Sequence, residues 1–140
     1  MPWTTMAAFC LSAAGVNKVR LGFDGERTED LRATIDHLKK TGPDVFLTTV
    51  SYPIKGTPYH DRVADRLTAG TAWAEGTDRD LIVKGRPVRR YYDFARRWMT
   101  AEVARDQHWR KRRYAAAAKA ATSALVGRLG MAVTGHWTEQ

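Results

Sequence analysis

The stretch VNKVRLGFDGERTEDLRATIDHLKKTGPDVFLTTVSY, residues 16–52, contains two different hydrophobic periods. Residues 16–23 alternate apolar with polar side chains, as a strand does. Residues 28–41 carry apolar side chains at positions i, i+4 and i+7, as on one face of a helix. Residues 45–52 form a β-branched run that is too apolar for a strand with one exposed face. This order predicts a βαβ unit with two parallel strands, the second of them buried.

The helix between the two predicted strands has marked ends. Thr28 is the expected N-cap, and the acidic pair that follows it suits the positive end of the helix dipole. Gly42 and Pro43 are expected to stop the helix. The apolar stripe is Leu31, Ile35 and Leu38.

A second helix is predicted directly after the second strand. Thr57 can cap it, and Pro58 fits the first helical position, where a missing N–H costs nothing. Tyr59, Val63 and Leu67 would then form its inward face. Right-handed crossovers would place this helix and the previous one on the same side of the sheet.

The rest of the chain gives weaker patterns. Residues 3–14 are apolar and alanine-rich, which favours the end of a helix. Residues 68–87 are rich in glycine and polar residues and predict a loop, with one short extended piece at 81–83. From Pro87 the apolar side chains recur at helical spacing, which predicts an amphipathic helix running to Arg113 and continuing through the alanine run that follows.

The charge divides the chain into two segments. Residues 1–85 hold 11 Lys and Arg against 11 Asp and Glu, whereas residues 86–140 hold 12 against 4 and so carry the whole net charge of +8. This shift predicts a β/α segment at 1–85 and a basic, mainly helical C-terminal extension at 86–140.

Composition also bounds the location and the chemistry. The longest weakly polar stretch, residues 6–16, is too short to span a bilayer and lacks the basic start of a secretory signal, so we expect a soluble, cytoplasmic protein. The single cysteine, Cys10, excludes an intramolecular disulfide and any multi-cysteine metal site built from this chain alone.

Both predicted strands end in unusual loops. GFDGE, residues 22–26, and SYPIKGTP, residues 51–58, contain glycines that let the backbone turn sharply and approach a ligand. Ligands of parallel α/β folds bind at the carboxyl ends of the strands. The alternative interpretation is that these are ordinary turns.

These residues also resemble a known family. In radical S-adenosylmethionine enzymes, especially the subgroup with an N-terminal cobalamin-binding domain, a strand ends in GxxGE or GxPGE, an acidic helix start of the type TxEDxxxTIxxL follows, and the next strand runs into PxxGTPxY. The corresponding residues here are Gly22, Gly25 and Glu26; Thr28, Glu29, Asp30, Thr34, Ile35 and Leu38; and Pro53, Gly56, Thr57, Pro58 and Tyr59. The pattern covers about 45 residues in the same order and spacing, with Asp24 where the commonest family turn has proline.

The resemblance implies a partial (β/α) barrel of about the last two βα units, followed by C-terminal helices. It also implies S-adenosylmethionine as cofactor, held at the two strand ends by Gly22, Phe23, Gly25, Glu26, Tyr52, Pro53, Gly56 and Thr57. The family ligates a [4Fe–4S] cluster through CxxxCxxC, upstream of this region, and the subgroup holds cobalamin in another domain.

The chain departs from the family at the cluster, because its one cysteine cannot supply CxxxCxxC. The resemblance therefore predicts a C-terminal fragment that is inactive by itself. The partners that this implies are the missing N-terminal half or a second copy of the chain.

Other candidate residues have plainer interpretations. Cys10 lies in an apolar neighbourhood that favours a buried small side chain over a reactive thiolate. Lys55 could meet a carboxylate or phosphate, or lie in solvent. Asp24 and Glu26 could act together in acid–base chemistry or metal binding, or serve as helix-entry charges. The histidines show no ligand spacing; they are His37, His60, His108 and His136.

The run Arg110, Lys111, Arg112 and Arg113 lies beside Trp109 and Tyr114. Cations with interleaved aromatic rings suit phosphate contacts and base stacking, so a non-catalytic module that binds nucleic acid or an acidic partner surface is the alternative function. A solvated face of a long helix is the simpler interpretation, and no nucleic-acid-binding motif accompanies the run.

Overall fold

The computed structural model describes residues 16–69 and 81–138. The elements in chain order are β1 (Val16–Leu21), α1 (Thr28–Thr41), β2 (Val45–Val50), α2 (Pro58–Val63), the 3-10 turn η2 (Ala64–Arg66), β3 (Leu67–Ala69), β4 (Leu81–Val83), α3 (Arg89–Arg110) and α4 (Tyr114–Thr134). A mixed α/β class with helices after residue 86 is therefore confirmed. The helix predicted at 3–14, and Cys10 with it, lies outside the described residues.

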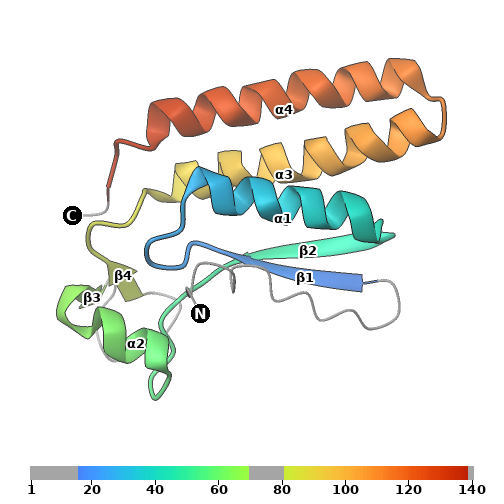
Figure 1. The fold of residues 1–140 in the computed structure, drawn as a ribbon. Coiled ribbons are helices and arrows are strands. Elements are labelled where there is room, and N and C mark those ends of the chain that lie inside the picture. Colours follow the sequence, from blue (N-terminus) through green and yellow to red (C-terminus); the bar gives the residue numbers. More distant parts are fainter. Residues whose placement is uncertain (1–15, 70–80, 139–140) are drawn as a thin grey trace.

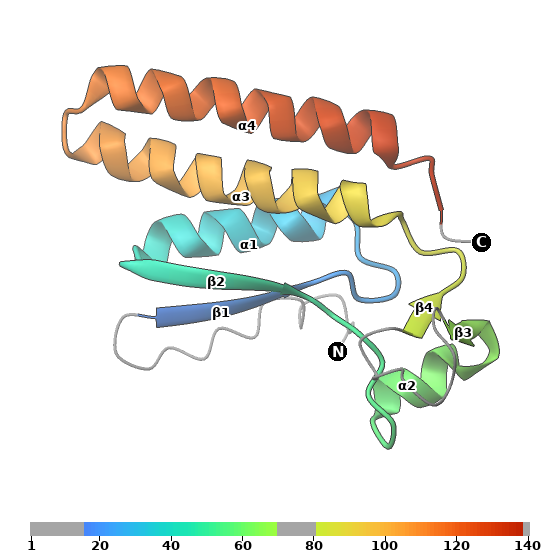
Figure 2. The same ribbon diagram turned by 180° about the vertical axis from the view of Figure 1, so that it is seen from behind.

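The elements stack in layers on one side of a small sheet. Figure 1 shows α1 lying over β1 and β2, α3 beside α1, and α4 outermost, and Figure 2 shows the same order from behind. The short unit of α2, β3 and β4 lies beyond the carboxyl ends of β1 and β2. The prediction that α2 and α1 cover the same side of the sheet is therefore wrong. The chain runs on beyond the carboxyl end of β2 before α2 begins, so α2 does not pack over the sheet.

Strands β1 and β2 are parallel, with Val16 opposite Val45 and Leu21 opposite Val50. The connection through α1 makes the predicted βαβ unit, which is confirmed. Each strand ends two residues earlier than its pattern predicts, so residues 22–23 and 51–52 belong to loops. Those loops are the ones from which a ligand site was expected.

The prediction that β2 is buried on both faces is wrong. Its side chains alternate between exposed and half-buried, and Val45 and Leu47 are 53% and 52% exposed. On the same face, β1 presents Lys18 and Arg20, since Lys18 pairs with Leu47. Within the described residues, the sheet is covered by α1 on one face only.

Helix α1 buries its predicted stripe of Leu31, Ile35 and Leu38. The expected N-cap at Thr28 is wrong by one residue: Arg27 occupies that position, and Thr28 is the first helical residue. The backbone N–H of Arg27 donates to Asp30 Oδ2 at 2.8 Å, so an acidic side chain in the first turn holds the helix start. The predicted stop is confirmed, because Gly42 ends the helix with a φ of 57°.

Helix α2 begins as predicted, with Pro58 at its first position and Thr57 Oγ1 accepting the N–H of His60 at 3.3 Å. It ends at Val63, which is buried. The predicted inward face is therefore wrong at Leu67, which begins β3 and pairs with Val83 of β4. The short extended piece predicted at 81–83 is confirmed as β4.

The C-terminal segment forms a helical hairpin, so the predicted continuous helix is wrong. Helix α3 ends at Arg110, the chain turns through residues 111–113, and α4 returns antiparallel to α3. Arg112 has a φ of 56°, the left-handed conformation that stops a helix. The backbone N–H of Arg113 donates to the carbonyl of His108 at 2.9 Å, which closes the turn.

One hydrophobic core joins the elements before and after residue 86. Its buried side chains come from β1, α1, α3 and α4, with Met99 and Leu38 fully enclosed. Lys39 of α1 pairs with Glu102 of α3 at 2.7 Å and links the two helices at their surface. None of the helices described in residues 16–69 and 81–138 is both long and apolar enough to cross a bilayer.

Candidate ligand site at the carboxyl ends of β1 and β2

The loop after β1 folds back on its own strand end. Gly22 and Gly25 have φ angles of 79° and 80°, which allow the turn. The N–H of Glu26 donates to the carbonyl of Phe23 at 3.0 Å, and the N–H of Gly22 donates to Glu26 Oε2 at 2.6 Å. The GFDGE motif thus places a carboxylate directly at the end of β1.

Glu26 has an unusual titration. Burial raises its pKa from 4.5 to about 7; the hydrogen bond from Gly22 opposes the rise, and the nearby charge of Asp30 adds to it. Near neutral pH both the protonated and the ionised form of this carboxyl group are therefore populated, and a cationic group placed beside it would favour the ionised form. Glu26 can therefore accept a proton or pair with an ammonium group.

The loop after β2 is tied to the end of β1. The N–H of Ser51 donates to the carbonyl of Leu21 at 2.6 Å, and Ser51 is only 7% exposed. Pro53 is fully buried, whereas Gly56 has a φ of 82° with open space where a Cβ would stand. Thr57 donates to the carbonyl of Ile54 at 2.7 Å and caps α2, so its side chain is engaged in holding the loop.

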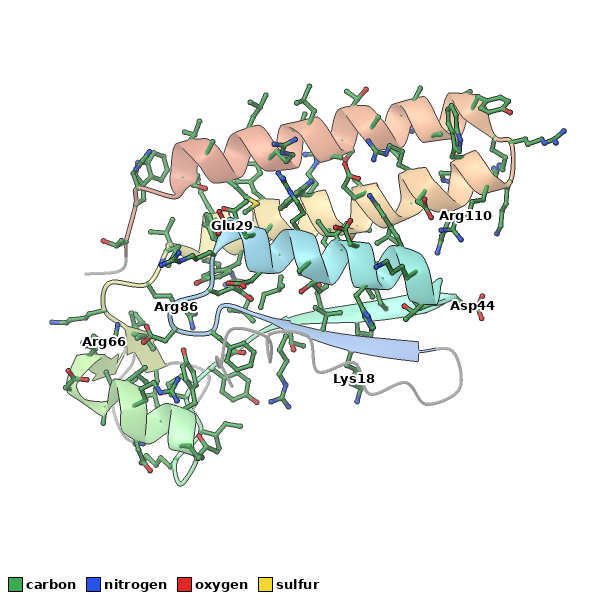
Figure 3. All side chains as sticks on the ribbon, in the orientation of Figure 1. Lys18, Glu29, Asp44, Arg66, Arg86 and Arg110 are labelled. Carbon is green, nitrogen blue, oxygen red and sulfur yellow. The ribbon has the colours of Figure 1, made fainter. Side chains whose placement is uncertain are left out.

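Arg86 joins these loops from the segment between β4 and α3, and Figure 3 labels it at this end of the sheet. Its Nη1 donates to the carbonyl of Ser51 at 2.7 Å, and its guanidinium lies 5.2 Å from the ring centre of Tyr92. The sequence analysis missed Arg86 as a site residue. A single arginine beside Gly85 and Pro87 belongs to no local motif, and only the tertiary fold brings it to Ser51.

Several polar atoms at this point are buried without a partner. Within residues 16–69 and 81–138, Ser51 Oγ, Tyr59 OH and Arg86 Nε make no hydrogen bond. Leaving such a group unpaired costs about 1–3 kcal/mol, so folded proteins satisfy nearly all of them with protein, water or ligand. All three atoms can donate, which suits a carboxylate or phosphate group.

The structure brings some of the predicted residues together. The rings of Phe23 and Tyr59 meet edge to face at 5.9 Å, which links the two loops. Gly22 packs so closely on Tyr92 and Val50 that a Cβ there would lie 2.9 Å from the Tyr92 ring. Tyr52 is half-buried in the second loop.

The other candidates are arranged differently. Asp24 pairs with Arg66 at 2.8 Å, whereas Glu26 accepts the Gly22 N–H, so the two acids have different partners. Among the described residues, no group of three or more His, Cys, Asp and Glu side chains could hold a metal ion.

A groove of about 540 Å³ lies elsewhere, between α3 and α4. Alanines form much of its lining, and Arg97 Nε donates to Ser123 Oγ at 3.1 Å across it. None of the buried unpaired polar atoms found among the described residues belongs to its lining. The strand ends are therefore the better candidate site.

The basic run forms the tip of the α3–α4 hairpin. Trp109 and Tyr114 are exposed, and their rings meet edge to face at 5.3 Å. Arg110 is engaged with Asp106 at 2.8 Å and with the carbonyl of Lys39 at 3.1 Å. Residues 111–113 have no ion pair in the part of the chain that the structure describes.

Comparison with family models, with curated protein sequences and with solved structures found no match to this chain. Its functional assignment therefore depends on its own residues and their geometry.

Proposed function

We propose that this chain is the C-terminal part of an enzyme of the radical S-adenosylmethionine type and contributes part of the cofactor site. The observation that carries the proposal is a set of buried, unpaired donors on Ser51, Tyr59 and Arg86. Arg86 and Tyr59 act electrostatically on Tyr92, as does the carboxyl group of Glu26, and Arg86 also binds the Ser51 carbonyl. These groups lie where two parallel strands end, which is the ligand position of parallel α/β folds.

The groups present fit the polar part of S-adenosylmethionine. Arg86, Ser51 and Tyr59 offer donors for the carboxylate of its methionine portion. Glu26 would pair with the α-ammonium group, which would favour its ionised form. Phe23 beside Tyr59 offers an aromatic surface for the adenine ring.

In the proposed enzyme the cluster ligands lie outside these 140 residues. The cysteines of CxxxCxxC are not among them, since Cys10 is their one cysteine. A [4Fe–4S] cluster held elsewhere would supply the electron that cleaves the cofactor to a 5′-deoxyadenosyl radical, and cobalamin would lie in a further domain. Strands β1 and β2, with two uncovered apolar side chains on one face, would continue into a larger barrel.

The proposal is tested by calorimetric titration with S-adenosylmethionine, S-adenosylhomocysteine and adenosine. We expect the two amino-acid-bearing ligands to bind more tightly than adenosine, and Arg86→Met to weaken them at least tenfold while leaving adenosine unchanged. Arg89→Met is the matched control, because Arg89 is exposed at the start of α3. Equal affinity of the Arg86 and Arg89 variants, with unchanged circular dichroism, would count against the site.

A second function has its own supporting observation. The exposed Trp109 and Tyr114 rings flank the cationic turn at residues 111–113, a combination that suits single-stranded nucleic acid or an acidic protein surface. Replacing Lys111, Arg112 and Arg113 by glutamine should then reduce the salt dependence of oligonucleotide binding, measured by fluorescence anisotropy. Binding that is weak and insensitive to both salt and these substitutions would eliminate this function.

A further inference from the structure

Helix α4 is apolar on two opposite faces. Its inner face packs on α3 through Ala124, Gly127 and Met131, which are buried. Its outer face has no neighbour among the described elements and forms the top of the molecule in Figure 1. Leu125, Leu129 and Val133 on that face are 55%, 58% and 62% exposed. A helix that is apolar all round is normally covered on both faces.

The exposed apolar positions follow a heptad spacing. The outer seam comprises Thr122, Leu125, Leu129 and Ala132, all of them exposed. Their separations of three, four and three residues are those of the a and d positions of a coiled coil. Val126 and Val133 extend the seam on one flank. The pattern predicts that the occupant of this face is another helix.

The charges of α4 are directed away from the outer seam. Its charged residues are Lys119 and Arg128. The guanidinium of Arg128 lies over the ring of Trp98 at 5.8 Å, and Lys119 lines the groove that α4 shares with α3. The seam itself carries no charge, so two copies of it meet without repulsion.

The pattern of side-chain sizes along the outer seam is the same in both chain directions. Two Leu residues stand at its centre, with the small side chains of Thr122 and Ala132 at its ends. When two such helices run antiparallel, Leu125 lies opposite Leu129 of the second copy, and Thr122 lies opposite its Ala132. A twofold interface requires this self-complementarity.

We propose that α4 pairs antiparallel with α4 of a second copy of this chain, through the outer seam. A 21-residue helix is about 31 Å long and about 10 Å wide, so each copy contributes a footprint of about 300 Å². The two copies together bury about 600 Å², below the roughly 1,200 Å² of stable interfaces, so the dimer is weak, reversible and dependent on concentration.

Sedimentation velocity on the full chain over a wide concentration range tests the pairing. We expect the mass to rise from 15.8 kDa toward twice that value with concentration, and Leu125→Glu with Leu129→Glu to keep the chain monomeric. The matched control is Val45→Glu with Leu47→Glu, the same change on the open sheet face, which should leave dimerisation intact. A chain that stays monomeric throughout, or a dimer abolished only by the sheet variant, overturns the proposal.

Disulfide trapping tests the orientation and does not require the glutamate variants to fold. In a Cys10→Ser background, a mixture of the Leu125→Cys and Leu129→Cys chains should give mainly the mixed disulfide. Parallel pairing would instead join identical cysteines, and a chain docked on a different polypeptide would give no cross-link. Either of these results overturns antiparallel self-pairing.

Discussion

Glu26 combines a buried position with a hydrogen bond that favours its charged form. Burial is the larger effect and raises its pKa to about 7, although the Gly22 N–H lies 2.6 Å from its carboxylate. A backbone hydrogen bond therefore fixes the position of this side chain, while its charge still changes with pH near neutrality. Such a group suits a ligand site better than a purely structural turn.

We expect Glu26 to make the chain less stable as the pH rises. Its folded pKa of about 7 lies above the unfolded value of 4.5, so the folded state binds the proton more tightly, and stability falls between these two values. The difference corresponds to about 3 kcal/mol. Glu26→Gln should abolish this part of the pH dependence in chemical denaturation, measured at pH 4.5 and pH 8.

A Glu26→Gln variant whose stability changes with pH as steeply as the parent chain would contradict this assignment. Asp36→Asn, at an exposed position on α1, is the control and should leave the profile unchanged.

Substitutions at Gly22 and Gly25 distinguish the cost of backbone strain from the cost of steric crowding. Both have a φ near 80°, where a side chain costs about 1–2 kcal/mol. Only at Gly22 would a Cβ also press on the Tyr92 ring and Val50, adding about 1–3 kcal/mol. Gly22→Ala should therefore destabilise the chain more than Gly25→Ala in urea unfolding. Equal losses in the free energy of unfolding would mean that the Tyr92 ring moves aside at no energetic cost.

At the scale of elements, the α3–α4 hairpin depends on glycine in the second helix. A Cβ at Gly127 would stand 2.7 Å from the backbone nitrogen of Trp98, so a side chain there would push the two helices apart. Glycine normally weakens a helix by about 1 kcal/mol relative to alanine. Position 127 is glycine because only a residue without a Cβ allows α4 to pack this closely on α3.

Gly127→Ala should therefore lower stability, despite its better helix propensity. We expect a loss of about 1–3 kcal/mol from overpacking, because the two nearest opposing atoms, the backbone nitrogen and Cα of Trp98, cannot rotate away. Lys119→Ala on the same helix should change stability by less than about 0.5 kcal/mol. Thermal unfolding followed by circular dichroism measures both, and a stabilised Gly127→Ala chain would show that the helices can separate at no cost.

At the scale of the whole molecule, the described chain has one main core and a smaller outlying unit. The core is built from β1, α1, α3 and α4, whereas α2, β3 and β4 contribute no residue to it. Val63 and Val83 are buried in the outlying unit. Strands β3 and β4 have three residues each, too few to be stable by themselves.

Native-state hydrogen exchange should therefore reveal two levels of stability. Amides of β3 and β4 should exchange through a local opening, well before those around Leu38 and Met99 in the main core. Arg86 connects the two regions through the carbonyl of Ser51, so Arg86→Met should speed exchange in the outlying unit most. Uniform exchange across both regions would indicate a single cooperative unit.

Local chemistry accounts for what could be predicted. The period of Leu31, Ile35 and Leu38, the stop at Gly42 and the cap at Thr57 depend on neighbours within a few residues, and each is confirmed. The hairpin turn was missed because the residues around Arg112 contain neither glycine nor proline. Helix α3 is stopped by Arg112, whose backbone adopts the left-handed conformation. No local sequence pattern predicts this conformation for an arginine.

The sequence by itself determined the βαβ order, the parallel pairing and the two glycine loops at the strand ends, because hydrophobic period and turn chemistry act over short distances. Only the tertiary structure decided that Arg86 and Tyr92 meet those loops, and that no described element covers one face of the sheet or the outer face of α4. Such contacts join residues far apart in the chain, and their energy depends on how layers pack rather than on any local pattern.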